Sequence, residues 1–178
     1  MVGLWREWRQ AITGRGGIRL IRIRRAHPEE RDFLSGLTIR SKGHWGYEDA
    51  FMEAVREELE FQPNKFQPDF HVYILEENGE RLGFCSLIPI DGETVELHDL
   101  FVEAKCIGKG YGKQLWNFAV GLARDLGYRK LTLTADPHAE EFYVSRGAVR
   151  VGERTSTALP ERKLPVMEYS LMDCTAGN

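Results

Sequence analysis

Three apolar segments with the two-residue alternation of β-strands follow one another closely at 70–77, 81–90 and 93–103. An Asn-Gly pair at 78–79 separates the first two segments, and an Asp-Gly pair at 91–92 separates the last two. Both dipeptides favour tight hairpin turns, and strands joined by such short turns pair antiparallel. The sequence therefore predicts a three-stranded antiparallel meander, against which the rest of the chain has to pack.

Extended and helical patterns flank this meander on both sides. Further strands are predicted at 18–26, 128–136, 148–153 and 165–172. Helices are predicted after His27-Pro28, within 47–60, at 110–126, and between Asp136-Pro137 and Gly147. The apolar face of the third helix consists of Leu115, Phe118, Ala119, Leu122 and Leu126. One sheet with helices packed on it accounts for this order of elements.

The length of 178 residues suits one domain, which we expect at 18–174, with a basic extension at 1–17 and a tail at 175–178. No apolar run approaches the ~20 residues of a membrane span, and no secretory signal opens the chain. The three cysteines are too few and too widely spaced for a disulfide framework or a metal pair, and the five histidines show no metal-ligand spacing. We therefore expect a cytoplasmic protein with free thiols, no metal site and no membrane partner.

Charge is spread unevenly along the chain. The 24 Lys and Arg against 27 Asp and Glu give a net charge of −3, too close to neutral for a general nucleic-acid binder. Residues 1–25 carry seven arginines and one glutamate, and this basic arm is either a solvated approach to the first strand or a contact for an acidic partner. Residues 47–60 carry six acids and one arginine, which form a solvated helix face or attract a cationic substrate.

The most informative stretch is LFVEAKCIGKGYGKQLW at 100–116, where a strand ends and a helix begins after a loop with three glycines. Glycines remove side-chain obstruction, so that backbone N–H groups at a helix N-terminus can face one anion. Lys109 and Lys113 add positive charge there. This chemistry suits a pyrophosphate, although the G-x-G-x-G spacing matches neither the dinucleotide fingerprint nor a Walker A loop. A flexible connector is the alternative interpretation.

Together with its flanks, this loop resembles the GNAT superfamily of acetyl-CoA-dependent N-acetyltransferases. That family carries Arg/Gln-x-x-Gly-x-Gly/Ala after a strand, and later Asn-x-x-Ala-x-x-Phe-Tyr-x-x-x-Gly-Phe. The residues that match these motifs are Gly110, Gly112, Ala139, Phe142, Tyr143 and Gly147. The resemblance extends over about 19–172, and the segments 41–54 and 157–171 look like one uncharacterised bacterial branch of the superfamily.

The sequence departs from the family pattern at three positions. Ile107 stands at the Arg/Gln position, which removes one polar anchor of the loop, although backbone amides carry most of that contact. Asp136 stands at the Asn position, where it is suited to cap the following helix instead of binding cofactor. Ala148 replaces the final Phe.

The resemblance implies the GNAT fold, an α/β structure with a mixed central sheet of about six to seven strands and helices on both faces. It implies a splay between the fourth and fifth strands, into which the pantetheine arm of acetyl-CoA, the cosubstrate, inserts as a pseudo-strand. A backbone N–H of Phe101 or Val102 would then face the thioester carbonyl. The cofactor-binding residues that it implies are Leu100, Phe101, Val102, Ile107, Gly108, Lys109, Gly110, Tyr111, Gly112, Lys113, Asp136 and Phe142.

The implied reaction is direct attack of a primary amine, on a small molecule or a peptide, on the acetyl thioester in a ternary complex. Tyr143 occupies the family's general-acid position, and the alternative is a core aromatic whose hydroxyl bonds to backbone. An alkylamine has a pKa of ~10 and therefore needs a base at pH 7. Strand alternation places Glu96 and His98 on one face and Asp99 on the other. We rank Glu96, acting through water, first, with His98 close behind and Asp99 third.

The acceptor side is less constrained by the sequence. His44, Trp45 and Tyr47 resemble the substrate-side loop of the family, and Trp45 could equally cover the core. Cys106 is interpreted as a loop residue, because no histidine base is paired with it. A non-catalytic acyl-CoA-binding or regulatory domain of the same fold, a nucleic-acid module using the basic arm, and a homodimer are also left open.

Overall fold

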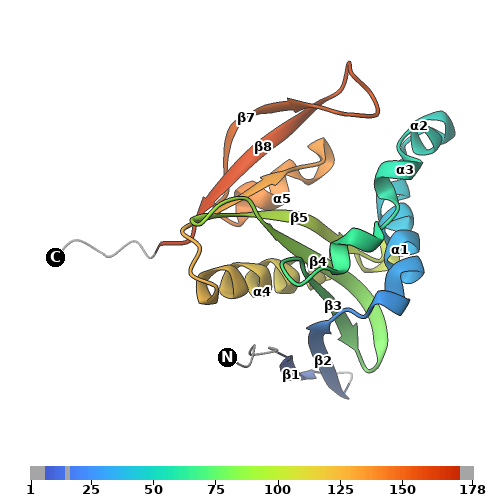
Figure 1. Ribbon diagram of the computed structural model, residues 1–178. Coiled ribbons are helices and arrows are strands. Elements are labelled where there is room, and N and C mark those ends of the chain that lie inside the picture. Colours follow the sequence, from blue (N-terminus) through green and yellow to red (C-terminus); the bar gives the residue numbers. More distant parts are fainter. Residues whose placement is uncertain (1–6, 15–16, 173–178) are drawn as a thin grey trace.

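The computed structural model describes residues 7–14 and 17–172 and shows an α/β fold around one mixed sheet (Figure 1). The strands lie in the order β1-β2-β3-β4-β5-β6-β8-β7, and within these residues every neighbouring pair is antiparallel except β5–β6. The strands are β1 (Trp8–Gly14), β2 (Gly17–Arg25), β3 (His71–Glu77), β4 (Glu80–Pro89), β5 (Thr94–Val102), β6 (Lys130–Thr134), β7 (Val149–Thr155) and β8 (Lys163–Ser170). The helices are α1 (Arg31–Gly43), α2 (Asp49–Ala54), α3 (Arg56–Leu59), α4 (Tyr111–Asp125) and α5 (Glu140–Ser145), with 3₁₀ turns η1 (Pro28–Glu30), η2 (Pro63–Phe66), η3 (Ala104–Cys106) and η4 (Pro137–Ala139).

The predicted meander is present as β3, β4 and β5. At its first turn Asn78 and Gly79 both have positive φ, +50° and +84°, as a tight hairpin turn between twisted strands requires. The second turn is wider, because the Asp91 carboxylate accepts hydrogen bonds from the backbone N–H groups of Glu93 and Thr94, at 2.8 and 2.7 Å. All the strands predicted from the sequence are present, with ends shifted by a few residues.

The N-terminal arm adds a strand that the sequence did not predict. Trp8–Gly14 pairs with β2 along its whole length, so the sheet has eight strands rather than six or seven. The alternation of residue types in 8–14 is too weak to indicate a strand, and pairing with β2 supplies the order. The predicted tail at 175–178 and Cys174 lie outside the described residues.

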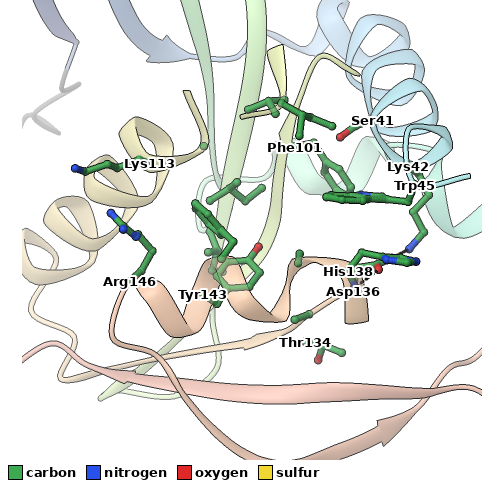
Figure 2. A pocket seen from close by; sticks show the side chains of 18 of the residues that line it. Ser41, Lys42, Trp45, Phe101, Lys113, Thr134, Asp136, His138, Tyr143 and Arg146 are labelled. Carbon is green, nitrogen blue, oxygen red and sulfur yellow. Dashed lines mark hydrogen bonds and ion pairs between the residues drawn. The ribbon is translucent and has the colours of Figure 1, made fainter. Parts of the chain in front are cut away.

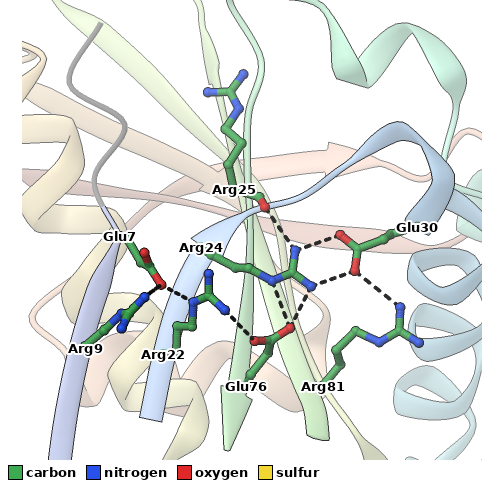
Figure 3. Close-up of polar contacts among 8 residues, drawn as sticks. All are labelled: Glu7, Arg9, Arg22, Arg24, Arg25, Glu30, Glu76 and Arg81. Atoms are coloured by element: carbon green, nitrogen blue, oxygen red, sulfur yellow. Dashed lines mark hydrogen bonds and ion pairs between the residues drawn. The ribbon is translucent and has the colours of Figure 1, made fainter. Parts of the chain in front are cut away.

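Figure 3 shows that arginines of this region are neutralised within the protein. Arg24 donates to Glu30 at 2.7 and 2.8 Å and to Glu76 at 2.8 Å. Arg22 pairs with Glu7 and Glu76, and further ion pairs join Arg9 to Glu7 and Arg19 to Glu77. Because these charges already have protein partners, the arm offers less to a nucleic-acid phosphate than its composition suggests.

Helices cover both faces of the sheet (Figure 1). The larger core lies between the sheet and α4, where Leu115 and Ala119 are fully buried. The smaller core lies between the sheet and α1, where Leu34 and Leu37 are fully buried. Leu126, which was assigned to the inner face of α4, is 43% exposed, because it lies after the last helical turn.

Two irregularities in β5 determine the shape of the sheet centre. β5 pairs with β6 only from Thr94 to Glu96, so the two strands separate beyond that point. They are the fourth and fifth strands of the prediction, which did not include β1, and the predicted splay between them is confirmed. His98 forms a bulge, because Leu97 pairs with Leu87 and Asp99 with the adjacent Ser86. The extra residue shifts the alternation of side chains between the two faces of the sheet by one position. Leu97 and Leu100, three residues apart, therefore lie on the same face and pack against the same core. Asp99 therefore does not lie on the face opposite Glu96, and the prediction from regular alternation was wrong.

Candidate active site

A cavity of about 480 Å³ opens where β5 and β6 separate. Its walls come from β5, the loop before α4, α5 and the C-terminal part of α1 (Figure 2). The predicted site residues that line it are Trp45, His98, Leu100, Phe101, Val102, Ile107, Gly108, Gly110, Gly112, Lys113, Asp136, Phe142 and Tyr143. Those that do not line it are His44, Tyr47, Glu96, Lys109 and Tyr111.

The loop before α4 forms an open cradle at one end of the cavity. Gly108 and Gly110 have φ of +80° and +91°, and a Cβ at either position would meet no atom within 4 Å. The first N–H groups of a helix have no intrahelical partner, and no described side chain caps α4. The Tyr111 side chain points elsewhere, since its hydroxyl donates to Glu77 at 2.9 Å. The cradle thus presents backbone donors to a space that glycine keeps clear.

Two cations accompany the cradle. Lys113 and Arg146 both line the cavity, and neither forms an ion pair with another residue in the described part of the chain (Figure 2). Arg146 was not predicted from the sequence, although it immediately precedes Gly147 of the second motif. Backbone N–H groups, a helix N-terminus and two cations together form an arrangement whose chemistry suits a diphosphate or similar anion.

Tyr143 lies in the middle of the cavity, and Figure 2 shows its hydroxyl pointing into it. Its ring packs against Trp116 and Phe142, with centroid distances of 5.7 and 5.1 Å, and is only 8% exposed. The hydroxyl makes no hydrogen bond to any residue from 17 to 172. Burial raises the pKa of Tyr143, so at neutral pH the hydroxyl is protonated and able to donate.

The predicted bases lie at the bulge in β5. His98 lines the cavity, and its Nδ1 lies 3.5 Å from Oε1 of Glu96. The hydrogen bond from His98 lowers the pKa of Glu96, against the opposing effect of burial. Asp99 is already engaged, because the Ser86 hydroxyl donates to it at 2.6 Å and Lys65 pairs with it at 3.2 Å. Of the predicted bases, His98 therefore faces the cavity, and Glu96 supports it from outside the lining.

Asp136 connects four segments at the other end of the cavity. It caps η4, as predicted, by accepting from the backbone N–H of His138 at 2.9 Å. It also accepts from Lys42, from the Tyr47 hydroxyl at 2.8 Å and from Arg162 at 3.2 Å. Although burial raises the pKa of Asp136, the charge of Lys42 and these hydrogen bonds keep it below its usual value. The acceptor sites of the carboxylate are therefore filled, which leaves no capacity for the cofactor contact that the resemblance implied.

Aromatic rings form the wall beside Asp136. Trp45 stacks on His138 with a centroid distance of 5.4 Å and an interplanar angle of 3°, and both line the cavity. Trp45 belongs to neither core cluster. His44 packs edge-on against Trp45, with a distance of 5.3 Å between the ring centroids. The sequence did not predict Lys42 and His138 as site residues, because nothing in their local pattern distinguishes them from ordinary surface residues.

Within 7–14 and 17–172, no group of three or more His, Cys, Asp or Glu is arranged to hold a metal ion. The helices in this part of the chain are all too short or too polar to span a bilayer.

The chain is similar to one known protein family and to a number of solved structures. A sequence profile described as the acetyltransferase (GNAT) family matches residues 35–148. No curated protein sequence matches the chain.

Solved structures share the fold at low sequence identity. A GCN5-related N-acetyltransferase from Rhodopseudomonas palustris is 23% identical, with a TM-score of 0.72, and the match covers 83% of this chain and 94% of that one. PaiA N-acetyltransferase from Thermoplasma acidophilum, in complex with coenzyme A, is 20% identical, with a TM-score of 0.67 over 84% and 98% of the two chains. Aminoglycoside 6′-N-acetyltransferase from Enterococcus faecium is 19% identical, with a TM-score of 0.62 over 84% and 97%.

The profile match covers more than half of the chain and includes the splayed strand, the glycine cradle and Tyr143. The chain therefore belongs to the acetyltransferase (GNAT) family.

Proposed function

We propose that this protein transfers an acetyl group from acetyl-CoA to a primary amine of a small molecule or peptide. The observation that carries the proposal is one continuous cavity with an anion cradle at one end and the hydroxyl of a buried tyrosine in its middle. A structural neighbour crystallised with coenzyme A supports acyl-CoA as the cosubstrate.

The cradle residues fit the diphosphate of coenzyme A. Gly108 and Gly110 leave room for it, the first N–H groups of α4 donate to it, and Lys113 and Arg146 balance its charge. Ile107, at the family's Arg/Gln position, lines the cavity as an apolar residue, so the backbone and the two cations carry this contact. Leu100 and Val102 lie on the part of β5 that β6 leaves unpaired and line the cavity, which supports the proposal that their backbone groups bind the pantetheine amides.

Bound acetyl-CoA supplies an acetyl thioester, which the amine nitrogen attacks to form an amide as the carbon–sulfur bond breaks. The amine attacks only as the free base, which is about 1 in 10³ of an alkylamine at pH 7. His98, with Glu96 beside its ring, takes up the amine proton directly or through a water molecule. The proton then leaves to solvent.

Charge also develops on the carbonyl oxygen and the sulfur. A backbone N–H of Phe101 or Val102, on the open stretch of β5, stabilises the oxygen. Tyr143 donates its hydroxyl proton to the departing sulfur, so that coenzyme A leaves as a thiol, and the phenolate regains a proton from solvent.

The experiment combines cofactor binding with turnover. Thermal melts with acetyl-CoA and CoA test the cradle, and release of free thiol with a panel of primary amines tests transfer. Tyr143→Phe should lower kcat by about 10² while the Kd for CoA stays within twofold. Tyr128→Phe, a half-buried tyrosine outside the cavity, serves as the matched control.

Binding of acetyl-CoA without thiol release for any amine would favour the alternative, a non-catalytic acyl-CoA-binding domain. Absence of binding to either cofactor would contradict both functions. Unchanged kcat in Tyr143→Phe would remove the acid role and leave transfer standing.

A further inference from the structure

Positive charge gathers at and behind the end of the cavity away from the glycine cradle, where Lys42 lines the cavity and Arg162 lies outside its lining. Two cations, Lys42 and Arg162, share the single carboxylate of Asp136, which gives this cluster a formal charge of +1. The three side chains are only 13%, 16% and 14% exposed. Figure 2 shows Lys42 and Asp136 meeting beside the ring of His138 at the edge of the cavity. We call Lys42, Asp136 and Arg162 the cationic cluster.

The carboxylates near this end already have partners. Asp136 is bound as described, Glu96 lies against His98, and Asp99 is paired with Lys65. The acids of 47–60 do not line the cavity. Glu58 acts on Lys42 electrostatically, but it is exposed on α3, where solvent screens its charge. The acid that lines this end of the cavity, Asp136, is already bound to two cations, so a second ammonium on an acceptor would gain little from it and would be repelled by Lys42.

Donors for an anion are present in the cationic cluster. Arg162 does not itself line the cavity; it lies behind Asp136, where its hydrogen bonds to other described residues use Nη2 only and its charge adds to that of Lys42. The guanidinium lies over the rings of Tyr47 and Phe51, at 5.0 and 4.8 Å, which hold it in place. The Lys42 ammonium lines the cavity and donates to Asp136 with one of its three N–H groups.

We infer that the acceptor is a small primary amine that also carries a carboxylate, and that Lys42 binds this carboxylate, with the charge of Arg162 behind Asp136 supporting it. The inference rests on the proposed acetyl transfer and names the class of amine that it uses. The amine is directed towards His98 and Tyr143, the carboxylate towards the cationic cluster, and the carbon chain lies along the stacked rings of Trp45 and His138. This inference replaces the expectation of a cationic acceptor that the acidic segment 47–60 suggested.

Matched pairs of acceptors test this inference directly. Glycine, β-alanine, γ-aminobutyrate, glutamate and phenylalanine are each compared with the carboxamide at the same carboxyl group, with saturating acetyl-CoA and thiol release as the readout. Spermidine and kanamycin represent polycations. We expect kcat/KM for the best acid to exceed that of its carboxamide by about ten- to a hundredfold, the range of a charge-assisted hydrogen bond. For α-amino acids, the reactivity of the amine by itself favours the carboxamide, because its amine is less basic and a larger fraction of it is the free base.

Variants locate the effect. Lys42→Met and Arg162→Met should each raise KM for the acid about tenfold or more, reduce the preference over the carboxamide, and leave the Kd for acetyl-CoA unchanged. Lys130→Met removes a lysine whose ion pair with Glu168 lies outside the cavity, and it should retain the wild-type preference. Thermal melts of all three variants identify any loss of folding, and Arg162→Gln provides a second substitution that keeps a polar side chain.

Two outcomes would overturn the inference while acetyl transfer stands. One is a preference for carboxamides or polycations over acids, and the other is an acid preference that survives in both Lys42→Met and Arg162→Met. Failure of acetyl-CoA to bind would instead contradict the proposed function on which the inference rests.

Discussion

A methyl group added at Gly110 should separate cofactor affinity from protein stability. Gly110 has φ of +91°, lines the cavity, and would direct a Cβ into space where no protein atom lies within 4 Å. Gly110→Ala therefore meets no steric clash in the free protein and costs only the backbone strain. At a site that binds a diphosphate through adjacent N–H groups, the same methyl group would occupy the space of the ligand.

The expected magnitudes differ for the two effects. A non-glycine residue in the left-handed region costs about 1–2 kcal/mol, and for a protein of this length each kcal/mol lowers Tm by about 2–4 °C. Losing one charge-assisted hydrogen bond to the diphosphate costs about 1.5–3 kcal/mol, which raises the Kd for CoA roughly ten- to a hundredfold. The stability change alone would leave the Kd nearly unaltered, because the protein remains folded under assay conditions.

Gly127 provides a matched control at the opposite end of α4. It has φ of +88°, its Cβ would also meet nothing within 4 Å, and it lies outside the cavity. Calorimetric titration with CoA and thermal melts should show similar Tm losses in Gly110→Ala and Gly127→Ala, with weaker CoA binding in Gly110→Ala alone. Equal affinity in both variants would refute the assignment of the loop as the diphosphate site.

Two further predictions concern the charged networks. The hydrogen bond from Arg24 lowers the pKa of Glu30 to about 2 from 4.5, so the stability that this carboxylate provides is complete above pH 4.5 and is lost as pH falls through about 2. Glu30→Gln should therefore lower the free energy of unfolding by about 1–2 kcal/mol at pH 7, after allowance for solvent screening. In urea melts, the variant should lose less stability than the wild type between pH 4.5 and 2, and the same loss in both proteins would contradict this prediction. Glu96→Gln should reduce kcat about 10²-fold without weakening CoA binding. As a control, Glu57→Gln changes an exposed acid of α3 and should leave kcat unchanged. Full activity in Glu96→Gln would show that His98 acts without Glu96.

Much of the candidate site could be predicted because its signals are local. The glycines of the cradle mark positions that need positive φ or room for a ligand, and Gly108 and Gly110 have both properties. The apolar repeat of α4 and the Asn-Gly turn likewise depend on neighbours a few residues away, so their patterns can be recognised directly. Tyr143 was located by its spacing from Gly147 in the second motif.

The rest depends on residues that are distant in the sequence. The bulge at His98 arises from the register between β4 and β5, and it moves Asp99 from the face that simple alternation assigns. The strand Trp8–Gly14 is formed by pairing with β2 rather than by its own pattern.

The sequence by itself determined the family, the sheet with its meander, and the end of the cavity that suits a diphosphate. Only the tertiary structure decided the charge around the end of the cavity away from the glycine cradle, because Lys42, Asp136 and Arg162 come from three separate segments. An ion pair between residues 94 positions apart leaves no periodic trace in the chain, and the sum of charges in a cavity is fixed only when folding brings its walls together.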